Sequence, residues 1–482
     1  MPLRSASGFV DRFGRAQRDT GNSTDFATDF TRAVRGKHGA PIGDVLHYPG
    51  RCSTGISAVF LVRGGASVPG SLFPVFESRF PTLKPLYLDA KDTASRFLAE
   101  IANTRELALD TEGASFHRFI DRIYLLQLST RQASAILDPL TIGVPDGLGA
   151  LLESRKVEVV LHDADYDLRL LHQDYGWHAT NIFDTRVAAQ LLGIRAFGLA
   201  ALLERFFGVK LDKKHQRADW SMRPLTQGML DYAAQDTEHL LDLRDRLGRE
   251  LERLGRSHWA AEEFARLEGT RWDAEEDRDA FLRMKGARDL TRRQLALLRE
   301  LVAWRDGVAR TLDRATFRVV GNEALLEIAR TAPTNRAALG AVKGMPRGIL
   351  ESRSSDILAA VERGRAVPDA ELPRFARAQR WERDPDFDDV VARLKSVRDQ
   401  AAERLDLDPG VLCARDRLEA VARRRPTSVA QLAEIPELRK WQIEALGEGF
   451  VRAVSQPGSA AATRKRVSIE ADPSRSGTTG EL

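Results

Sequence analysis

The chain has 482 residues, of which 43% are hydrophobic and 29% charged, a composition typical of a soluble globular protein with room for about three domains. No apolar run approaches the ~18–20 residues of a membrane-spanning helix, and residues 1–40 lack the apolar core of a secretory signal. The two cysteines, Cys52 and Cys413, are far apart in the sequence, which excludes a disulfide framework and favours a reducing cytoplasm. The formal net charge is only +4, from 73 basic and 69 acidic residues, too small by itself to establish nucleic-acid binding.

The first half of the chain predicts one α/β domain after a poorly ordered start. Residues 1–83 carry scattered Gly, Ser, Pro and Arg without a sustained helical period, which predicts an extension without stable structure. Over 84–254 a strand-rich start is followed by alternating strands and helices, which indicates an α/β layer with a mixed sheet. We expect strands at 106–109, 123–128, 135–137 and 157–161, helices near 93–104 and 147–155, and further helices up to Leu254.

Beyond Leu254 the strand signals stop and the sequence repeats itself. After a helical linker at 255–290, a shift of 93 residues aligns Arg305-Asp306 with Arg398-Asp399, Pro333-Thr334 with Pro426-Thr427, and many positions between and beyond them. We therefore expect two copies of an all-helical bundle, at 291–365 and 386–456. Each copy should have a long first helix, a Pro-Thr break whose Thr caps the next helix, and two shorter helices. Residues 457–482, rich in Ser, Gly, Thr and Ala, predict a disordered tail.

Acidic residues follow two of the expected strands. Asp110 and Glu112 stand two apart at the end of an apolar strand, so they share a face and could offer two hard oxygen ligands to a divalent cation. Asp163, Asp165 and Asp167 follow another strand and open a helix, where α/β sheets commonly hold ligands. Taken alone, the first pair is better explained as a solvated loop, and the second group fits helix capping as well as ligand binding.

A third group lies on a predicted helix. Tyr232 and Asp236 stand four residues apart and so share one helix face. A tyrosine hydroxyl beside a metal-binding carboxylate can hold and orient an attacking water. Without the other two groups, an ordinary amphipathic helix with a half-buried Tyr would explain this pair better.

Together the three groups resemble the DEDD superfamily of 3′-to-5′ exonucleases, in the subclass that uses Tyr, and within it the ribonuclease D family. The similar stretch covers about 85–456, and the paired helical modules look like the helicase-and-RNase-D C-terminal (HRDC) domain. The resemblance implies a ribonuclease H-like mixed-sheet exonuclease domain followed by two all-α HRDC bundles. Further matching motifs are Leu126-Gln127-Leu128, Leu137-Asp138-Pro139-Leu140, His162, Phe183-Asp184-Thr185, Leu211-Asp212-Lys213-Lys214, Ala218-Asp219-Trp220-Ser221 and Arg223-Pro224-Leu225.

The resemblance also implies residue roles. Asp110, Glu112, Asp167 and Asp236 would hold two metals, and Tyr232 would orient the water. The choice of Asp167 rests on the family's spacing after His162, so Asp163 and Asp165 stay open as sharers of that role. Gly113 and the segment 115–122 depart from the family pattern, which leaves the substrate preference less defined than the chemistry.

The expected cofactors are two Mg²⁺ or Mn²⁺ ions. Two cations about 3.5–4 Å apart can activate the nucleophile and relieve charge on the leaving 3′ oxygen. Zn²⁺ would require His or Cys ligands, which these motifs lack. No phosphate-binding loop of the G-x-x-x-x-G-K-[ST] type occurs, so no nucleotide cofactor is expected.

The expected partner is RNA. Lys213, Lys214, Arg217, Trp220 and Arg223 are candidates to contact phosphates and to stack a base. A salt-bridged surface loop with Trp220 in the core explains the same residues equally well. We expect a cytoplasmic 3′-to-5′ exoribonuclease that trims single-stranded 3′ ends of structured RNAs such as tRNA precursors. The competing interpretations are a DNA exonuclease and a catalytically dead nucleic-acid-binding protein, and the sequence leaves the oligomeric state open.

Overall fold

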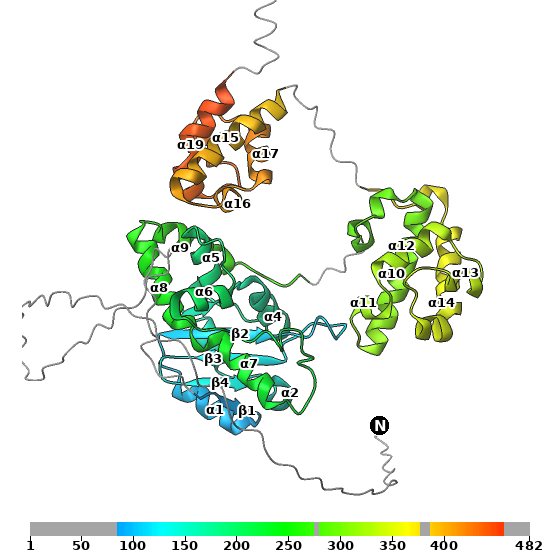
Figure 1. The fold of residues 1–482 in the computed structure, drawn as a ribbon, viewed down its shortest axis with the longest axis horizontal. Helices are drawn as coiled ribbons and strands as arrows, with labels where there is room; N and C mark the ends of the chain where they lie inside the picture. The colour runs from blue at the N-terminus through cyan, green and yellow to red at the C-terminus, as the bar shows by residue number, and fades with distance from the viewer. Residues whose placement is uncertain (1–83, 274–278, 376–385, 457–482) are drawn as a thin grey trace, which may run out of the picture. The chain divides into compact units, whose positions relative to one another are not determined.

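The computed structural model describes residues 84–273, 279–375 and 386–456 (Figure 1). The extension expected at 1–83 and the tail expected at 457–482 lie outside the described residues. No helix in the described ranges is both long and apolar enough to cross a membrane.

A mixed six-stranded sheet forms the centre of the first part, with strand order β1-β4-β3-β2-β5-β6. Strands β2, β3 and β4 pair antiparallel, while β1 pairs with β4, β5 with β2, and β6 with β5 in parallel, which confirms the mixed sheet expected from the sequence. The strands are β1 (Leu86–Leu88), β2 (Glu106–Glu112), β3 (Leu125–Ser129), β4 (Ser134–Leu137), β5 (Glu158–Leu161) and β6 (Ile182–Asp184). β1 and β6 were not expected, because three residues are too short to show a period of two.

Helices cover both faces of this sheet. Leu109 and Leu128 point to one face and pack in a core with residues of α1, α3 and α4. On the other face, Leu125 and Ile136 pack against α7, and Ala108 packs with residues of α5, α6 and α8. The helices are α1 (Lys91–Glu100), α2 (Pro139–Ile142), α3 (Leu148–Leu152), α4 (Asp165–Tyr175), α5 (Thr185–Leu191), α6 (Leu199–Phe207), α7 (Gln227–Glu238) and α8 (Leu240–Arg253).

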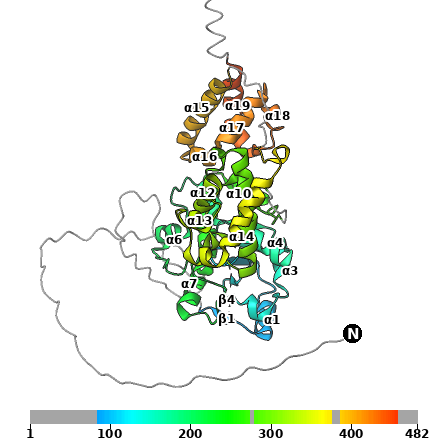
Figure 2. The same cartoon turned by 90° about the vertical axis from the view of Figure 1, so that its right-hand side faces the viewer.

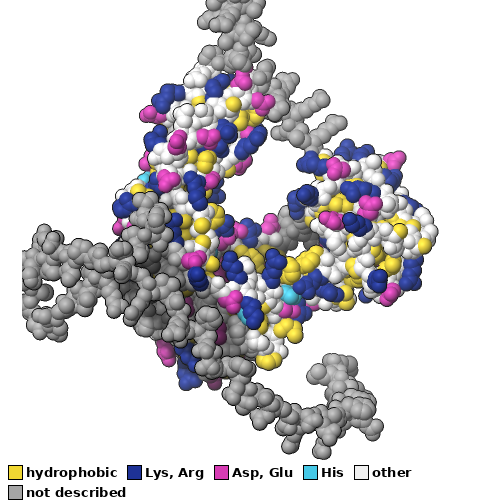
Figure 3. Space-filling view, in the orientation of Figure 1, with side chains coloured by type: hydrophobic (Ala, Val, Ile, Leu, Met, Phe, Trp, Pro, Cys, Tyr) yellow, Lys and Arg dark blue, Asp and Glu magenta, His cyan; other side chains and the backbone are white. Residues whose placement is uncertain are grey.

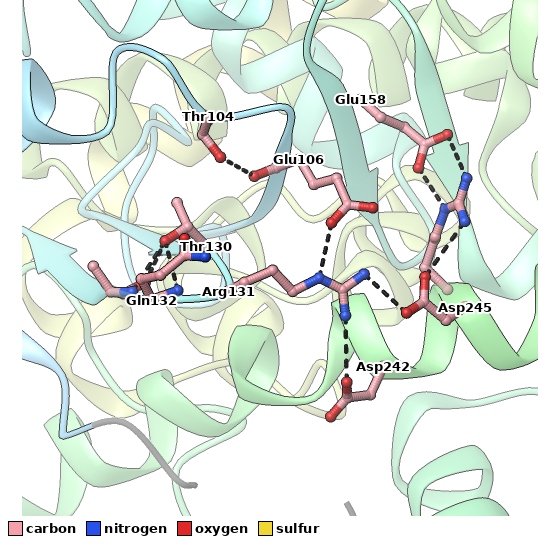
Figure 4. A network of polar contacts seen from close by, with 10 residues as sticks. Thr104, Glu106, Thr130, Arg131, Gln132, Glu158, Asp242 and Asp245 are labelled. Atoms are coloured by element: carbon pink, nitrogen blue, oxygen red, sulfur yellow. Dashed lines mark hydrogen bonds and ion pairs between the residues drawn. The ribbon is translucent and has the colours of Figure 1, made fainter. Parts of the chain in front are cut away.

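Arg131, in the turn between β3 and β4, joins the sheet to α8 (Figure 4). Its guanidinium lies 2.8 Å from a carboxylate oxygen of Glu106 at the start of β2, and 3.4 and 3.0 Å from those of Asp242 and Asp245 on α8. One cation therefore fixes α8 to the sheet. Because α7 and α8 are consecutive, this contact also limits where α7 lies over the strands.

The remaining described residues are helical. Residues 255–290, expected as a helical linker, contain α9 (Ser257–Leu267) and the short 3-10 helices η1 (Ala280–Arg283) and η2 (Ala287–Asp289). The first bundle has α10 (Arg292–Leu312), α11 (Thr316–Val319), α12 (Asn322–Thr331), α13 (Arg336–Gly340) and α14 (Arg347–Ala366), followed by η3 (Asp369–Glu371). The second has α15 (Phe387–Leu405), α16 (Pro409–Leu412), α17 (Arg415–Arg424), α18 (Val429–Leu432) and α19 (Lys440–Ser455).

The two bundles repeat each other in the register expected from the sequence. α10 and α15 end 93 residues apart, and the next residue of each, Asp313 and Asp406, has a positive φ. The helices expected in each copy were wrong in number and length: each bundle has five helices among the described residues, α10–α14 and α15–α19. The last of them, α14 or α19, is also long and packs against the first (Figure 2).

The expected cap at the Pro-Thr break was also wrong by one residue. Asn335 caps α13 by accepting a hydrogen bond from Ala338, and Ser428 caps α18 by accepting one from Gln431. Thr334 and Thr427 precede these caps. The residue just before each Pro, Ala332 or Arg425, has a positive φ and ends the preceding helix, α12 or α17.

Candidate active site

Three carboxylates from two elements meet at the carboxyl end of β2. Asp110 and Glu112 lie on the face of β2 that α7 covers, and Asp236 lies near the end of α7. One ligand oxygen from each of the three lies within 4.8 Å of the other two. α7 is oriented by its cap, since the Thr226 side chain accepts a hydrogen bond from the Met229 N–H. This oxygen-only donor set suits a hard divalent cation.

Asp167 reaches the same end of the sheet from the opposite face. It lies in the first turn of α4 and is 4% exposed. Its Oδ1 accepts hydrogen bonds from the backbone N–H of Thr111 at 3.1 Å and from the Thr111 hydroxyl at 2.5 Å. Thr111 is the residue between Asp110 and Glu112, so the fourth carboxylate is tied directly to the strand that carries the first two.

The two neighbouring candidates face solvent. Asp163 and Asp165 are exposed and pair with Arg186 and Arg169, respectively. Among the described residues, none of Asp163, Asp165 and Asp167 belongs to the group of Asp110, Glu112 and Asp236, but Asp167 alone of them is hydrogen-bonded to Thr111. Of the three aspartates that follow β5, Asp167 is the one that the fold turns toward β2.

Asp184, at the end of β6, explains why the chain turns this way. This buried carboxylate accepts hydrogen bonds from the N–H groups of Asp163 and Ala164 before α4, and from those of Arg186 and Val187 at the start of α5. It therefore caps two chain segments at once. The sequence motif Phe183-Asp184-Thr185 did not reveal this role; an Asp directly before a helix is the signal that could have identified it as a cap.

Burial and mutual repulsion raise the pKa values of these carboxyl groups and favour their protonated form. Desolvation, followed by the charges of the neighbouring carboxylates, raises the pKa of Asp110 and Glu112 well above the usual range. Burial raises the pKa of Asp236 to about 7, and it raises the pKa of Asp167 to about 7 against the opposing hydrogen bonds from Thr111. A bound cation would favour the ionised form of these carboxyl groups instead.

Tyr232 lies one turn before Asp236 on α7 and is half-buried. Burial raises its pKa, and so do the nearby carboxylates of Asp236, Glu112 and Asp110, so the hydroxyl stays protonated at neutral pH. Its ring lies 6.0 Å from that of Trp220 and 6.1 Å from that of His215, centroid to centroid. A neutral hydroxyl group therefore lies beside the acidic cluster.

The residues expected to contact nucleic acid fall into two groups. Lys213, Lys214 and Arg217 are exposed, and the Arg217 guanidinium lies 5.6 Å from the centre of the Phe116 ring. Trp220 is 1% exposed and lies in the core against α7. Elsewhere on the face shown in Figure 3, Lys and Arg are interspersed with Asp and Glu, in keeping with the small net charge.

Arg223, the last of these residues, is engaged with the protein itself. Its Nη2 donates to Oδ1 of the fully buried Asp138 at 2.6 Å and to the Tyr124 carbonyl at 3.0 Å. Its Nη1 donates to the carbonyls of Trp220 and Met222. Arg223 therefore fastens the loop that precedes α7 to the end of β4, an anchoring contact that the sequence did not reveal.

Comparison with known proteins identifies the family of the chain. A family model described as 3'-5' exonuclease matches residues 86–252, and a model of the HRDC domain matches residues 294–361 and 387–454. Ribonuclease D of Gluconacetobacter diazotrophicus is 32% identical over 345 residues, which cover 71% of this chain and 86% of that protein. The chain belongs to the ribonuclease D family. The family resemblance and the fold expected from it are thereby confirmed.

Solved structures support the same assignment. The crystal structure of Escherichia coli RNase D, described as an exoribonuclease involved in structured RNA processing, matches with a TM-score of 0.60 at 25% identity, covering 77% of this chain and 99% of that one. The catalytic core of RRP6 from Trypanosoma brucei matches with a TM-score of 0.54 at 29% identity, covering 62% and 85%. As a ribonuclease D, this protein is a 3′-to-5′ exoribonuclease. The acidic cluster further indicates that it uses divalent metal.

Proposed function

We propose that this ribonuclease D cleaves RNA with two divalent cations, Mg²⁺ or Mn²⁺, held by Asp110, Glu112, Asp167 and Asp236. Two such cations supply a hydroxide nucleophile at neutral pH and stabilise the leaving 3′ oxygen. The observation that carries the proposal is the meeting of three carboxylates within 4.8 Å, next to a fourth that Thr111 ties to the same strand. Four carboxylates balance the charge of two divalent cations.

In this proposal Tyr232 orients the attacking water. The raised pKa keeps its hydroxyl protonated at working pH, so it can donate a hydrogen bond to a water or to a phosphate oxygen. Trp220 lies beside the Tyr232 ring and acts as a support within the core. In this proposal the domain at 84–254 performs the cleavage, and the helical bundles at 291–365 and 386–456 bind RNA.

The proposed substrates are single-stranded 3′ ends of structured RNAs such as tRNA precursors, in the cytoplasm. Relatives named ribonuclease D support an RNA substrate, and the Escherichia coli relative is described as acting in structured RNA processing. The exposed cations Lys213, Lys214 and Arg217 lie in the loop between α6 and α7, the helix that carries Tyr232 and Asp236. In this proposal they contact the phosphate backbone.

A matched pair of variants tests the proposal. The assay follows 5′-labelled single-stranded RNA, with DNA of the same sequence alongside, in Mg²⁺ or Mn²⁺. We expect a 3′-to-5′ ladder on RNA that EDTA abolishes and that Asp167→Asn abolishes, whereas Asp165→Asn, which alters an exposed neighbour, retains it. Activity that survives Asp167→Asn would overturn the ligand assignment, and faster degradation of DNA would overturn the proposed substrate.

A further inference from the structure

Gln127 is the least satisfied polar side chain beside the active site. It is fully buried in β3, and neither its amide nitrogen nor its amide oxygen has a hydrogen-bond partner among the described residues. Burying a primary amide without partners costs on the order of 2–5 kcal/mol, which is why such groups are scarce in folded proteins. An amide retained at this position calls for a hydrogen-bond partner close by.

The strand register places this amide beside a proposed metal ligand. Gln127 is directly opposite Asp110 in the antiparallel pairing of β3 with β2. Directly opposed residues on neighbouring strands project to the same face, with Cβ atoms about 4.5–5.5 Å apart. On its other side, Gln127 is opposite Ile136 of β4, which packs against α7. The Gln127 side chain therefore lies between the sheet and α7, next to Asp110.

The helix above it carries a second proposed ligand. Ser129, two residues along β3 on the same face, has its hydroxyl 2.8 Å from that of Thr237 on α7. Asp236 directly precedes Thr237, and its carboxylate is within 4.8 Å of that of Asp110. The contact between Ser129 and Thr237 thus brings the end of α7 over the part of β3 that contains Gln127.

We propose that Gln127 is a positioning residue for the metal-binding carboxylates, whose amide N–H groups hydrogen-bond carboxylate oxygens of Asp110 or Asp236 that face away from the cations. A carboxylate that ligates a metal through one side keeps lone pairs that a neighbouring donor can occupy. Such a bond fixes the direction of the ligand and raises metal affinity. This inference rests on the proposed two-cation function.

Removal of the amide separates this role from a packing role. Gln127→Leu keeps the side-chain size and deletes both amide atoms. In EDTA, we expect it to unfold at the same temperature as the wild type or higher, because an unpaired polar group is gone. In calorimetric titration of the full chain with Mn²⁺ alone, we expect its affinity to fall by about 10–100-fold. RNA cleavage should recover at high Mn²⁺, with the KM for RNA unchanged.

Ser134→Ala is the matched control. Ser134 is buried on β4, directly opposite Ser129, and its hydroxyl is paired with that of Ser129. Its loss should lower the unfolding temperature in EDTA and leave the Mn²⁺ affinity within about twofold. Gln127→Met, with a more flexible apolar chain, is a second test should the leucine variant fold poorly, and it should lose Mn²⁺ affinity in the same way.

The outcomes distinguish this inference from the proposed function. Wild-type Mn²⁺ affinity in a folded Gln127→Leu or Gln127→Met protein would overturn the role of Gln127 and leave the metal site intact. A variant that loses stability in EDTA but keeps its metal affinity would assign Gln127 to packing. Failure of the wild-type protein to bind Mn²⁺ would overturn the proposed metal site itself.

Discussion

Thr111 donates two hydrogen bonds, from its backbone N–H and its hydroxyl, to the same carboxylate oxygen of Asp167. Thr111 is in β2, within the sheet, and Asp167 is in the first turn of α4, which packs against one face of the sheet. Because Thr111 stands between Asp110 and Glu112, any movement of Asp167 relative to these ligands must break or bend these bonds. The geometry of the site therefore depends on a residue that is not itself a proposed ligand.

Removal of the Thr111 hydroxyl should weaken catalysis while preserving the fold. Thr111→Val keeps the shape and the backbone donor but deletes the 2.5 Å hydrogen bond. Hydrogen bonds to charged groups are worth about 1.5–3 kcal/mol, so we expect kcat to fall by roughly 10–100-fold, with a smaller change in the KM for RNA. Thr111→Ser restores the hydroxyl and should recover most of the activity in steady-state kinetics. Equal activity of the Val and Ser variants would contradict this role.

Metal binding should strengthen as the pH rises through about 7. Asp167 and Asp236 have pKa values raised to about 7, so below that pH a cation must displace protons from the site. Calorimetric titration with Mn²⁺ at pH 6, 7 and 8 should show rising affinity. Repeating it in buffers of different ionisation enthalpy should show proton release that shrinks at pH 8. An affinity independent of pH would be inconsistent with these shifts.

The same shifts determine how stability depends on pH without metal. The unfolded carboxyl groups lose their protons near pH 4, whereas these folded ones keep theirs until about pH 7. The folded state therefore binds more protons in this window, and the cluster's contribution to stability is lost as the pH rises from about 4 to above 7. Thermal unfolding in EDTA should show this loss, and saturating Mn²⁺ should remove it. If rising pH stabilised both the wild type and the Asp110→Asn variant in EDTA, the raised pKa values would be contradicted.

Arg223 should stabilise the fold by pairing with the buried Asp138. Arg223→Ala leaves the buried Asp138 carboxylate without its cation, which typically costs about 3–5 kcal/mol in the free energy of unfolding. Tyr87→Phe removes only the 2.6 Å hydrogen bond to the same carboxylate and should cost about 1 kcal/mol. Urea unfolding of the two variants measures the difference. A loss below about 1 kcal/mol for Arg223→Ala would return this residue to the candidates for RNA contact.

The exposed cations before α7 should act on RNA affinity. Replacing Lys213 and Lys214 by Ala should raise the KM for single-stranded RNA and leave kcat nearly unchanged. The slope of log affinity against log salt should become less negative by about 0.7 for each phosphate that the variant no longer neutralises. Lys156→Ala, at an exposed position just before the amino end of β5, is the control and should leave the slope unchanged. Identical slopes in all three proteins would exclude the loop as an RNA-binding element.

Much of the site follows from local sequence rules. The alternation of a strand places Asp110 and Glu112 on one face, and the pitch of a helix places Tyr232 and Asp236 on another. The 93-residue repeat in the sequence predicted the two bundles, and the positive φ of Asp313 and Asp406 repeats in that register. These features depend on residues within a few positions of each other or on a direct comparison of two segments.

Other parts depend on contacts that no local pattern contains. The choice among Asp163, Asp165 and Asp167 is made by the left-handed backbone at Asp163 and by Asp184, which follows them by more than 15 residues. The burial of Arg223 against Asp138 joins positions 85 residues apart. The sequence shows the charge of these side chains, whereas the fold determines what they contact.

The most direct test of the account is anomalous diffraction from crystals of the full chain grown with Mn²⁺ and a nucleoside 5′-monophosphate. The account predicts two Mn²⁺ peaks held by carboxylate oxygens of Asp110, Glu112, Asp167 and Asp236. The Tyr232 hydroxyl should lie within hydrogen-bond distance of a water or phosphate oxygen between them. A single peak, or peaks that Asp167 does not touch, would contradict the two-cation site.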